Sequence, residues 1–210
     1  MKEKIFQIIN FLKYKLFARH RKGFSVHSPF VFELLNNVFF EKEYYYCYNE
    51  IEKIVAKNTH KSLFFNKLKY YKLFFRLANY FNAQKILIVG KNNFIEKIFT
   101  FVSSKTKIFY AENIEKMEKN DFDLMFFAEG HFDQREKSRV QNRFLPAVEM
   151  TAKKDNSILI FENIYKNENI NEIWKNIITD NNLKISIDIF RYGIIINKND
   201  IPKQHYRVAF

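Results

Sequence analysis

Lys85-Ile86-Leu87-Ile88-Val89-Gly90 is the stretch of this 210-residue sequence that decides the fold class. A short apolar run that ends in glycine is typical of a parallel strand buried on both faces. Similar runs follow at residues 107–112, 123–128 and 157–161, and helical patterns separate them at residues 94–102, 133–150 and 168–179. Strands that alternate with helices in this way indicate an α/β protein with a mostly parallel sheet.

The end of the chain departs from this alternation. Residues 184–190 and 193–197 read as two strands that only Arg191-Tyr192 joins. Two residues cannot make the crossover that a parallel pair needs, so we expect an antiparallel hairpin at this end of the sheet.

The residues before the first strand read as helices. Ser28 is a good N-cap and Pro29 suits the first helical turn. The helical patterns cover residues 4–20, a stretch from Pro29 onward, residues 50–57 and residues 67–81. We therefore expect a helical extension over residues 1–60 and an α/β domain over residues 61–210.

The first helix carries an apolar stripe with lysines beside it. The stripe residues recur at helical spacing and are Ile5, Ile8, Ile9, Leu12 and Leu16. We expect this stripe to pack on the domain. The alternative is a basic amphipathic helix that rests on a membrane or on a partner.

Arg19, Arg21 and Lys22 form a basic cluster after this helix, followed by Gly23. Cations suit the negative end of the helix dipole, and a glycine can supply the left-handed residue that ends a helix. Contact with phosphate or another anionic partner is the functional alternative. His27, beside the next helix cap, is expected to be structural, with a functional imidazole as the alternative.

The composition bounds the possible partners and the location. The net charge of +12 fits RNA, an anionic membrane surface or an acidic protein as partner, and it also fits a general drift towards Lys, Asn, Ile, Phe and Tyr. With 4 Gly and 3 Pro, a barrel or sandwich rich in tight turns is disfavoured.

Cys47 is the single cysteine, which excludes an internal disulfide, and its aromatic neighbours predict an inert thiol. Without an apolar segment long enough to span a bilayer, and without a signal-peptide pattern, we expect a cytoplasmic protein.

Four segments of the sequence share the order and spacing of a known family. They are residues 19–32, with Arg19-His20 and His27-Ser28-Pro29-Phe30, residues 123–131, residues 160–164 and residues 187–194. Together they resemble the small methyltransferases of Bacteroidetes-type bacteria, within the class I S-adenosylmethionine-dependent superfamily. The resemblance implies a Rossmann-like methyltransferase fold, with S-adenosylmethionine as cofactor if the protein is active and none otherwise.

The cofactor positions implied by the resemblance are only partly kept. Gly90 keeps the first glycine after the strand, and Glu112 keeps the acid that holds the ribose hydroxyls. Ile88 stands where the family has an acid, and Phe94, or Asn92 in a different register, stands where it has a later glycine. A bulky ring in this loop is expected to obstruct the close approach of a ligand to the backbone.

The stretch between the second and third strands is too short for the family pattern. Only residues 113–122 lie there, where the family places a helix, a strand and a further helix. Such a stretch has room for one short crossover. In the superfamily's strand labels we therefore predict the order 2-1-4-5-7-6, with strand 3 absent and strand 7 antiparallel.

The remaining implied site residues are altered as well. Without gaps the family aspartate falls on Ala128, with Glu129 next to it as a weaker cofactor contact. His131 keeps the place of the family histidine and is the candidate general base, with a structural role, capping the next helix or packing beneath it, as the alternative. Glu162 and Asn163 replace paired aspartates, and their oxygens are the candidate ligands of Mg²⁺.

Two functions follow from these residues. The first is a degenerate methyltransferase-fold protein that has lost methyl transfer and acts through binding, with its basic N-terminal helix against RNA, an anionic membrane surface or a protein assembly. The alternative is an active S-adenosylmethionine-dependent enzyme, O-methyltransferase-like, on an unidentified acceptor. Fold alone does not separate them, because function depends on the site.

Overall fold

A computed structural model of the chain describes residues 2–19, 23–58, 61–90, 92–111, 121–128 and 154–210. Several predicted features therefore lie outside the described residues. They are Arg21, Lys22, Glu112, Glu129, His131, the stretch that was expected to lack a strand and the helix expected at residues 133–150.

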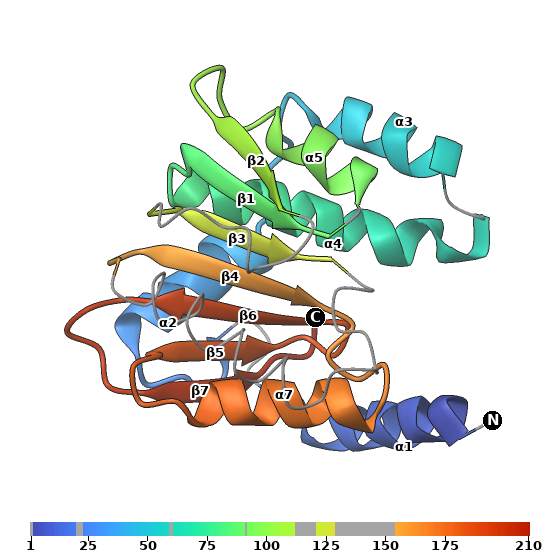
Figure 1. Cartoon of the computed structure of the whole chain (residues 1–210), viewed down its shortest axis with the longest axis vertical. Coiled ribbons are helices and arrows are strands. Elements are labelled where there is room, and N and C mark those ends of the chain that lie inside the picture. Colours follow the sequence, from blue (N-terminus) through green and yellow to red (C-terminus); the bar gives the residue numbers. More distant parts are fainter. Residues whose placement is uncertain (1, 20–22, 59–60, 91, 112–120, 129–153) are drawn as a thin grey trace.

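The described residues form a seven-stranded sheet in the order β2-β1-β3-β4-β6-β5-β7 (Figure 1). The strands are β1 (Lys85–Val89), β2 (Lys107–Ala111), β3 (Leu124–Phe127), β4 (Ser157–Glu162), β5 (Ile185–Asp188), β6 (Tyr192–Asn197) and β7 (Gln204–Arg207). β6 runs antiparallel to β4 and β5, whereas the other neighbouring pairs are parallel. This confirms the predicted Rossmann-like α/β fold with its terminal antiparallel hairpin.

The strand order matches the prediction for six strands and adds a seventh. In the superfamily's labels, β3, β4, β5 and β6 are strands 4, 5, 6 and 7, which gives the expected 2-1-4-5-7-6. β7 was not predicted and pairs in parallel with β5 at the edge of the sheet. The hairpin turn is also longer than predicted. It comprises Ile189, Phe190 and Arg191, and Tyr192 already belongs to β6.

Helices cover both faces of the sheet (Figure 1). They are α1 (Lys2–Phe17), α2 (Pro29–Leu34), the π-helix η2 (Leu35–Phe39), α3 (Tyr48–Asn58), α4 (Lys61–Tyr80), α5 (Asn93–Phe99) and α7 (Glu168–Thr179). Ser28 caps α2 as predicted, because its hydroxyl accepts the Val31 amide at 3.4 Å. None of the described helices is both long and apolar enough to cross a bilayer.

The side chains of β1 alternate between two cores. Ile86 and Ile88 belong to the larger core, which includes residues of α2, η2, α3, α4 and α5. Leu87 and Val89 belong to the smaller core, in which Trp174 of α7 is buried. Side chains on both faces of β1 are therefore buried, as its continuous apolar run predicts.

The first helix corrects the sequence interpretation. All five residues of the apolar stripe are exposed, and the buried residue of α1 is Tyr14, on another face. The helix ends at Phe17 instead of residue 20, because Arg19 forms a parallel β-bridge with Val208. Gly23 therefore does not end the helix. Its φ of 78° and the Phe32 ring, 2.5 Å from where a Cβ would lie, explain the glycine.

Candidate functional site

The turn after β1 begins with a glycine in the left-handed region of backbone conformation. Gly90 has a φ of 88°, and its N–H donates to Ala111 O at 2.9 Å, which holds the loop against β2. Asn92 then caps α5, because its Oδ1 accepts the amides of Phe94 and Ile95 at 3.2 Å each. The positive φ explains why a glycine stands at position 90.

The side chains at this turn do not suit a cationic ligand. Ile88, which stands in the place of an acid, is fully buried between Tyr110 of β2 and Phe126 of β3. Phe94 packs half-buried against the same core. The loop therefore presents apolar groups where the resemblance implies a carboxylate and a glycine.

The end of β3 is apolar as well. Ala128, at the place of the family aspartate, is buried, and its N–H donates to Val89 O at 2.9 Å. A methyl group offers no ligand to a metal or a hydroxyl. Glu129, His131 and Glu112, the other candidates at this edge, lie outside the described residues.

Glu162 and Asn163, the candidate metal ligands, lie at the end of β4. The Tyr192 hydroxyl donates to Glu162 at 3.2 Å, while burial, together with this carboxylate, raises the pKa of Tyr192 well above its ordinary value. Asn163 has a φ of 55°, and its N–H donates to Arg191 O at 2.6 Å. The described part of the chain contains no group of three His, Cys, Asp or Glu side chains placed to hold a metal.

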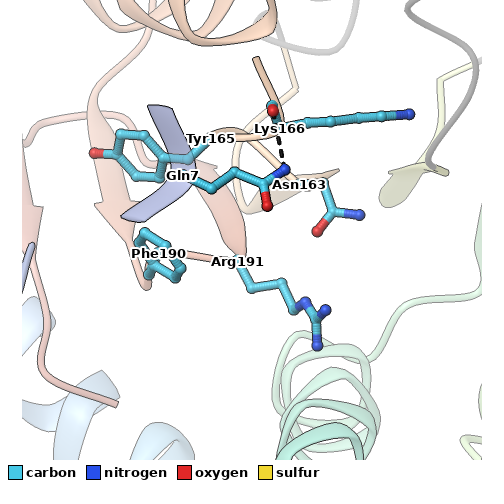
Figure 2. A pocket seen from close by; sticks show the side chains of 6 residues that line it. All are labelled: Gln7, Asn163, Tyr165, Lys166, Phe190 and Arg191. Atoms are coloured by element: carbon cyan, nitrogen blue, oxygen red, sulfur yellow. Dashed lines mark hydrogen bonds between the residues drawn. The ribbon is translucent and has the colours of Figure 1, made fainter. Parts of the chain in front are cut away.

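A pocket of about 230 Å³ lies beside Asn163 (Figure 2). The described residues that line it come from α1, from the loop after β4 and from the β5–β6 turn, and are Gln7, Asn163, Tyr165, Lys166, Phe190 and Arg191. Two of these side chains are cationic, two are amides and none is acidic. The pocket therefore favours an anionic or neutral polar group over a metal ion or a sulfonium.

A buried cluster fixes the wall of this pocket. Asp188 is fully buried and accepts the Tyr165 hydroxyl at 2.5 Å, the Phe190 amide at 2.8 Å and Arg207 Nε at 3.1 Å. Burial, and then the charge of Asp188, raises the pKa of Tyr165 above its ordinary value. The Tyr165 ring stacks on Phe190, whose φ of 66° is held by these contacts.

Helix α1 closes one side of the pocket, a contribution that sequence reasoning missed. Gln7 Nε2 donates to Lys166 O at 3.0 Å (Figure 2). The Tyr14 hydroxyl donates to Val208 O, and the rings of Phe11 and Tyr14 lie 5.2 and 5.3 Å from the Phe190 ring. Because these partners are about 160 to 190 residues apart in sequence, no local pattern points to them.

The other residues singled out from the sequence lie away from this pocket. Arg19 is exposed, and its backbone pairs with the end of β7 through Arg207 O and the Ala209 amide. His27 is exposed beside the α2 cap. Burial raises the pKa of Cys47 to about 11, which keeps the thiol protonated and agrees with an inert cysteine.

Comparison with known proteins finds likeness only among solved structures. No protein-family model matches the sequence, and no curated protein matches it significantly. The O-methyltransferase TomG from Streptomyces achromogenes, in complex with SAM, gives a TM-score of 0.47 at 7% identity, over 75% of this chain and 92% of its own. The SAH-bound Podospora anserina methyltransferase PaMTH1 gives 0.48 at 11% identity, over 82% and 97%.

A third solved structure is similar to the same extent. The O-methyltransferase from Bacillus cereus, in complex with SAH, gives a TM-score of 0.45 at 12% identity, over 73% of this chain and 90% of its own. All three TM-scores are below 0.5, so these likenesses assign neither a ligand nor an activity to this chain.

Proposed function

We propose that this chain is a degenerate descendant of the small Bacteroidetes-type methyltransferases, which keeps the fold, does not transfer methyl groups and acts by binding an anionic partner. The observation that carries this proposal is the turn after β1. Ile88 is buried where an acid is needed, and the half-buried Phe94 ring packs against the same core.

Electrostatics supports the proposal. S-adenosylmethionine carries positive charge on its sulfur and on its ammonium group, so its site needs fixed negative charge nearby. Ile88 and Ala128 supply none, and the pocket beyond β4 adds the cations Lys166 and Arg191. The same charges, with a net charge of +12 for the whole chain, favour an anionic partner.

One observation favours the alternative of an active O-methyltransferase-like enzyme. Gly90 keeps a positive φ at the end of β1, the conformation that favours the glycine expected at this position. In that case Glu112 would hold the ribose, Glu129 would contact the cofactor and His131 would act as general base. Glu162 and Asn163 would offer oxygen ligands to Mg²⁺.

Thermal unfolding in the presence of ligand separates the two proposals. A ligand at about one hundred times its Kd stabilises a protein by about 2.7 kcal/mol. For a chain of this size that shifts the Tm by about 5–10 °C. We expect no shift with S-adenosylmethionine or its demethylated product at millimolar concentration.

The contrary result would be a shift of several degrees that Glu112→Ala removes. Glu172→Ala is the matched control, because Glu172 is an exposed glutamate on α7, far in sequence from the predicted cofactor positions. A shift that survives in the control and is lost in Glu112→Ala would show that the cofactor site is kept, and it would favour the active enzyme over the degenerate one.

A further inference from the structure

Helix α1 presents its apolar side to solvent. The five residues of the apolar stripe, Ile5, Ile8, Ile9, Leu12 and Leu16, keep between 46% and 74% of their surface exposed. At 100° per residue they fall on one arc of the helix over about three turns. A contiguous row of this kind, unlike a single exposed leucine, marks an interaction surface.

The opposite side of α1 is the side that holds it to the domain. Tyr14, Gln7 and the Phe11 ring make the contacts with Val208, Lys166 and Phe190 described above. Asn167 Nδ2 also donates to Glu3 at 3.4 Å. Turning the helix to bury its stripe would break all of these contacts, so the outward orientation is built into the fold.

Lysines flank the stripe on both sides. Lys2 and Lys13 follow it on one side of the helix and Lys4 and Lys15 on the other, and all four are exposed. Glu3, the single acidic residue of α1, lies on the side of the domain beside Asn167. The exposed surface of α1 is therefore an apolar band between two cationic rows.

We propose that α1 binds in the plane of an anionic bilayer surface, with the apolar stripe among the upper acyl chains and the four lysines among the lipid phosphates. Helices of this pattern bury their apolar side at the boundary between headgroups and chains. Lysine stems cover apolar surface while their ammonium groups reach the phosphates, and anionic lipids attract each such cation.

A second copy of this chain fits the surface less well. A two-fold axis would bring the same patch of both copies together, which sets lysine rows against lysine rows. Five side chains on one helix also offer less than the roughly 800 Å² per partner of a stable interface. Charge complementarity therefore favours an anionic bilayer surface over self-association.

This proposal rests on the binding role proposed above, since it names the partner for that role. The two are nevertheless measured separately. Binding of S-adenosylmethionine would contradict the proposed loss of the cofactor site and leave vesicle binding unaffected, whereas a failure to bind vesicles would refute the membrane assignment alone.

Vesicle sedimentation with the full chain tests the proposal. We expect binding to vesicles of phosphatidylcholine with about one third phosphatidylserine, and at least about tenfold weaker binding to pure phosphatidylcholine. The double variant Ile8→Ser, Leu12→Ser should weaken binding to the anionic vesicles by at least about tenfold. Because both residues are exposed, the Tm of this variant should stay that of the parent.

Two further variants sharpen the result. Tyr44→Ser removes an exposed aromatic residue outside α1 and should leave vesicle binding unchanged. Lys4→Gln with Lys15→Gln should weaken binding to anionic vesicles and reduce its dependence on salt. Absence of vesicle binding, or binding that the stripe variant does not weaken, would overturn the proposal. So would a dimer in light scattering that the stripe variant dissociates, or retention on RNA in place of vesicles.

Discussion

Replacement of Asp188 by alanine is expected to destabilise this protein by about 3–5 kcal/mol, because three hydrogen-bond donors lose a fully buried charged acceptor. Asp188 is fully buried, and its carboxylate accepts from Tyr165, Phe190 and Arg207. The variant leaves a buried hydroxyl, an amide and a guanidinium without this acceptor. Since domains are stable by about 5–15 kcal/mol, the loss is a large share of the total.

Urea unfolding followed by circular dichroism measures this loss. Asp188→Asn should cost less than Asp188→Ala, because an amide oxygen still accepts the Phe190 amide. Asp121→Ala, at an exposed aspartate, is the control and should change the unfolding free energy by less than about 0.5 kcal/mol. A cost below about 1 kcal/mol for Asp188→Ala would refute the role given to the buried carboxylate.

Three further predictions concern stability. Gly193→Ala would place a Cβ 2.6 Å from Trp174 Cζ3, so it should destabilise by about 1–3 kcal/mol in urea unfolding, and an unchanged midpoint would contradict the packing of α7 on β6. Arg76 is buried and donates to Val38 O at 2.5 Å, Phe39 O at 3.1 Å and the Tyr48 hydroxyl at 2.8 Å, so Arg76→Met should cost about 2–3 kcal/mol, and Arg76→Lys should recover only part of it. Burial raises the pKa of Tyr70 and of Tyr71 to about 12. The neutral phenols therefore stabilise the folded protein fully below pH 10, and this contribution to the unfolding free energy is lost as the pH rises through 12, by about 2–3 kcal/mol for each tyrosine. A stability that stays flat between about pH 9 and pH 12 in denaturant titrations would refute that last prediction.

The central strands of the sheet could be predicted from the sequence because side chains on both of their faces are buried. Ile86 to Val89 and Ile158 to Phe161 are continuous apolar runs, and each alternates between the two cores. The hairpin was readable from the short connection between its strands, although the turn takes three residues and not two. Phe190 explains this difference, because its left-handed φ is held by Asp188 and Tyr165, which are contacts that a local pattern does not show.

Strand β7 was missed because its stability comes from its neighbour. Gln204–Arg207 is short and mostly polar, with only Tyr206 buried, so it carries no strand periodicity. It pairs because β5 offers an open edge and because Arg207 lies in register with Asp188, to which its Nε donates. Such pairing depends on tertiary context, which propensity does not capture.

The orientation of α1 on the domain could not be predicted from its apolar pattern. The period of Ile5, Ile8 and Leu12 reveals an apolar side but not the surface that this side contacts. In the folded chain the buried carbonyl of Val208 needs a donor, which Tyr14 supplies, and Gln7 adds a hydrogen bond to Lys166 O on the same side of the helix, so the apolar side turns outward. The pocket beside Asn163 arises from the same long-range packing, so sequence identified Asn163 but neither Gln7 nor Arg191 as its neighbours.

The carboxyl ends of β1 and β3 carry the central claim, that the fold persists without its cofactor. Isothermal titration calorimetry with S-adenosylmethionine and its demethylated product, with and without Mg²⁺, tests this claim most directly. With Ile88 and Ala128 where acids are needed, we predict no heat of binding at millimolar ligand. Binding in the micromolar range that Glu112→Ala abolishes would contradict the claim and favour the alternative of an active enzyme.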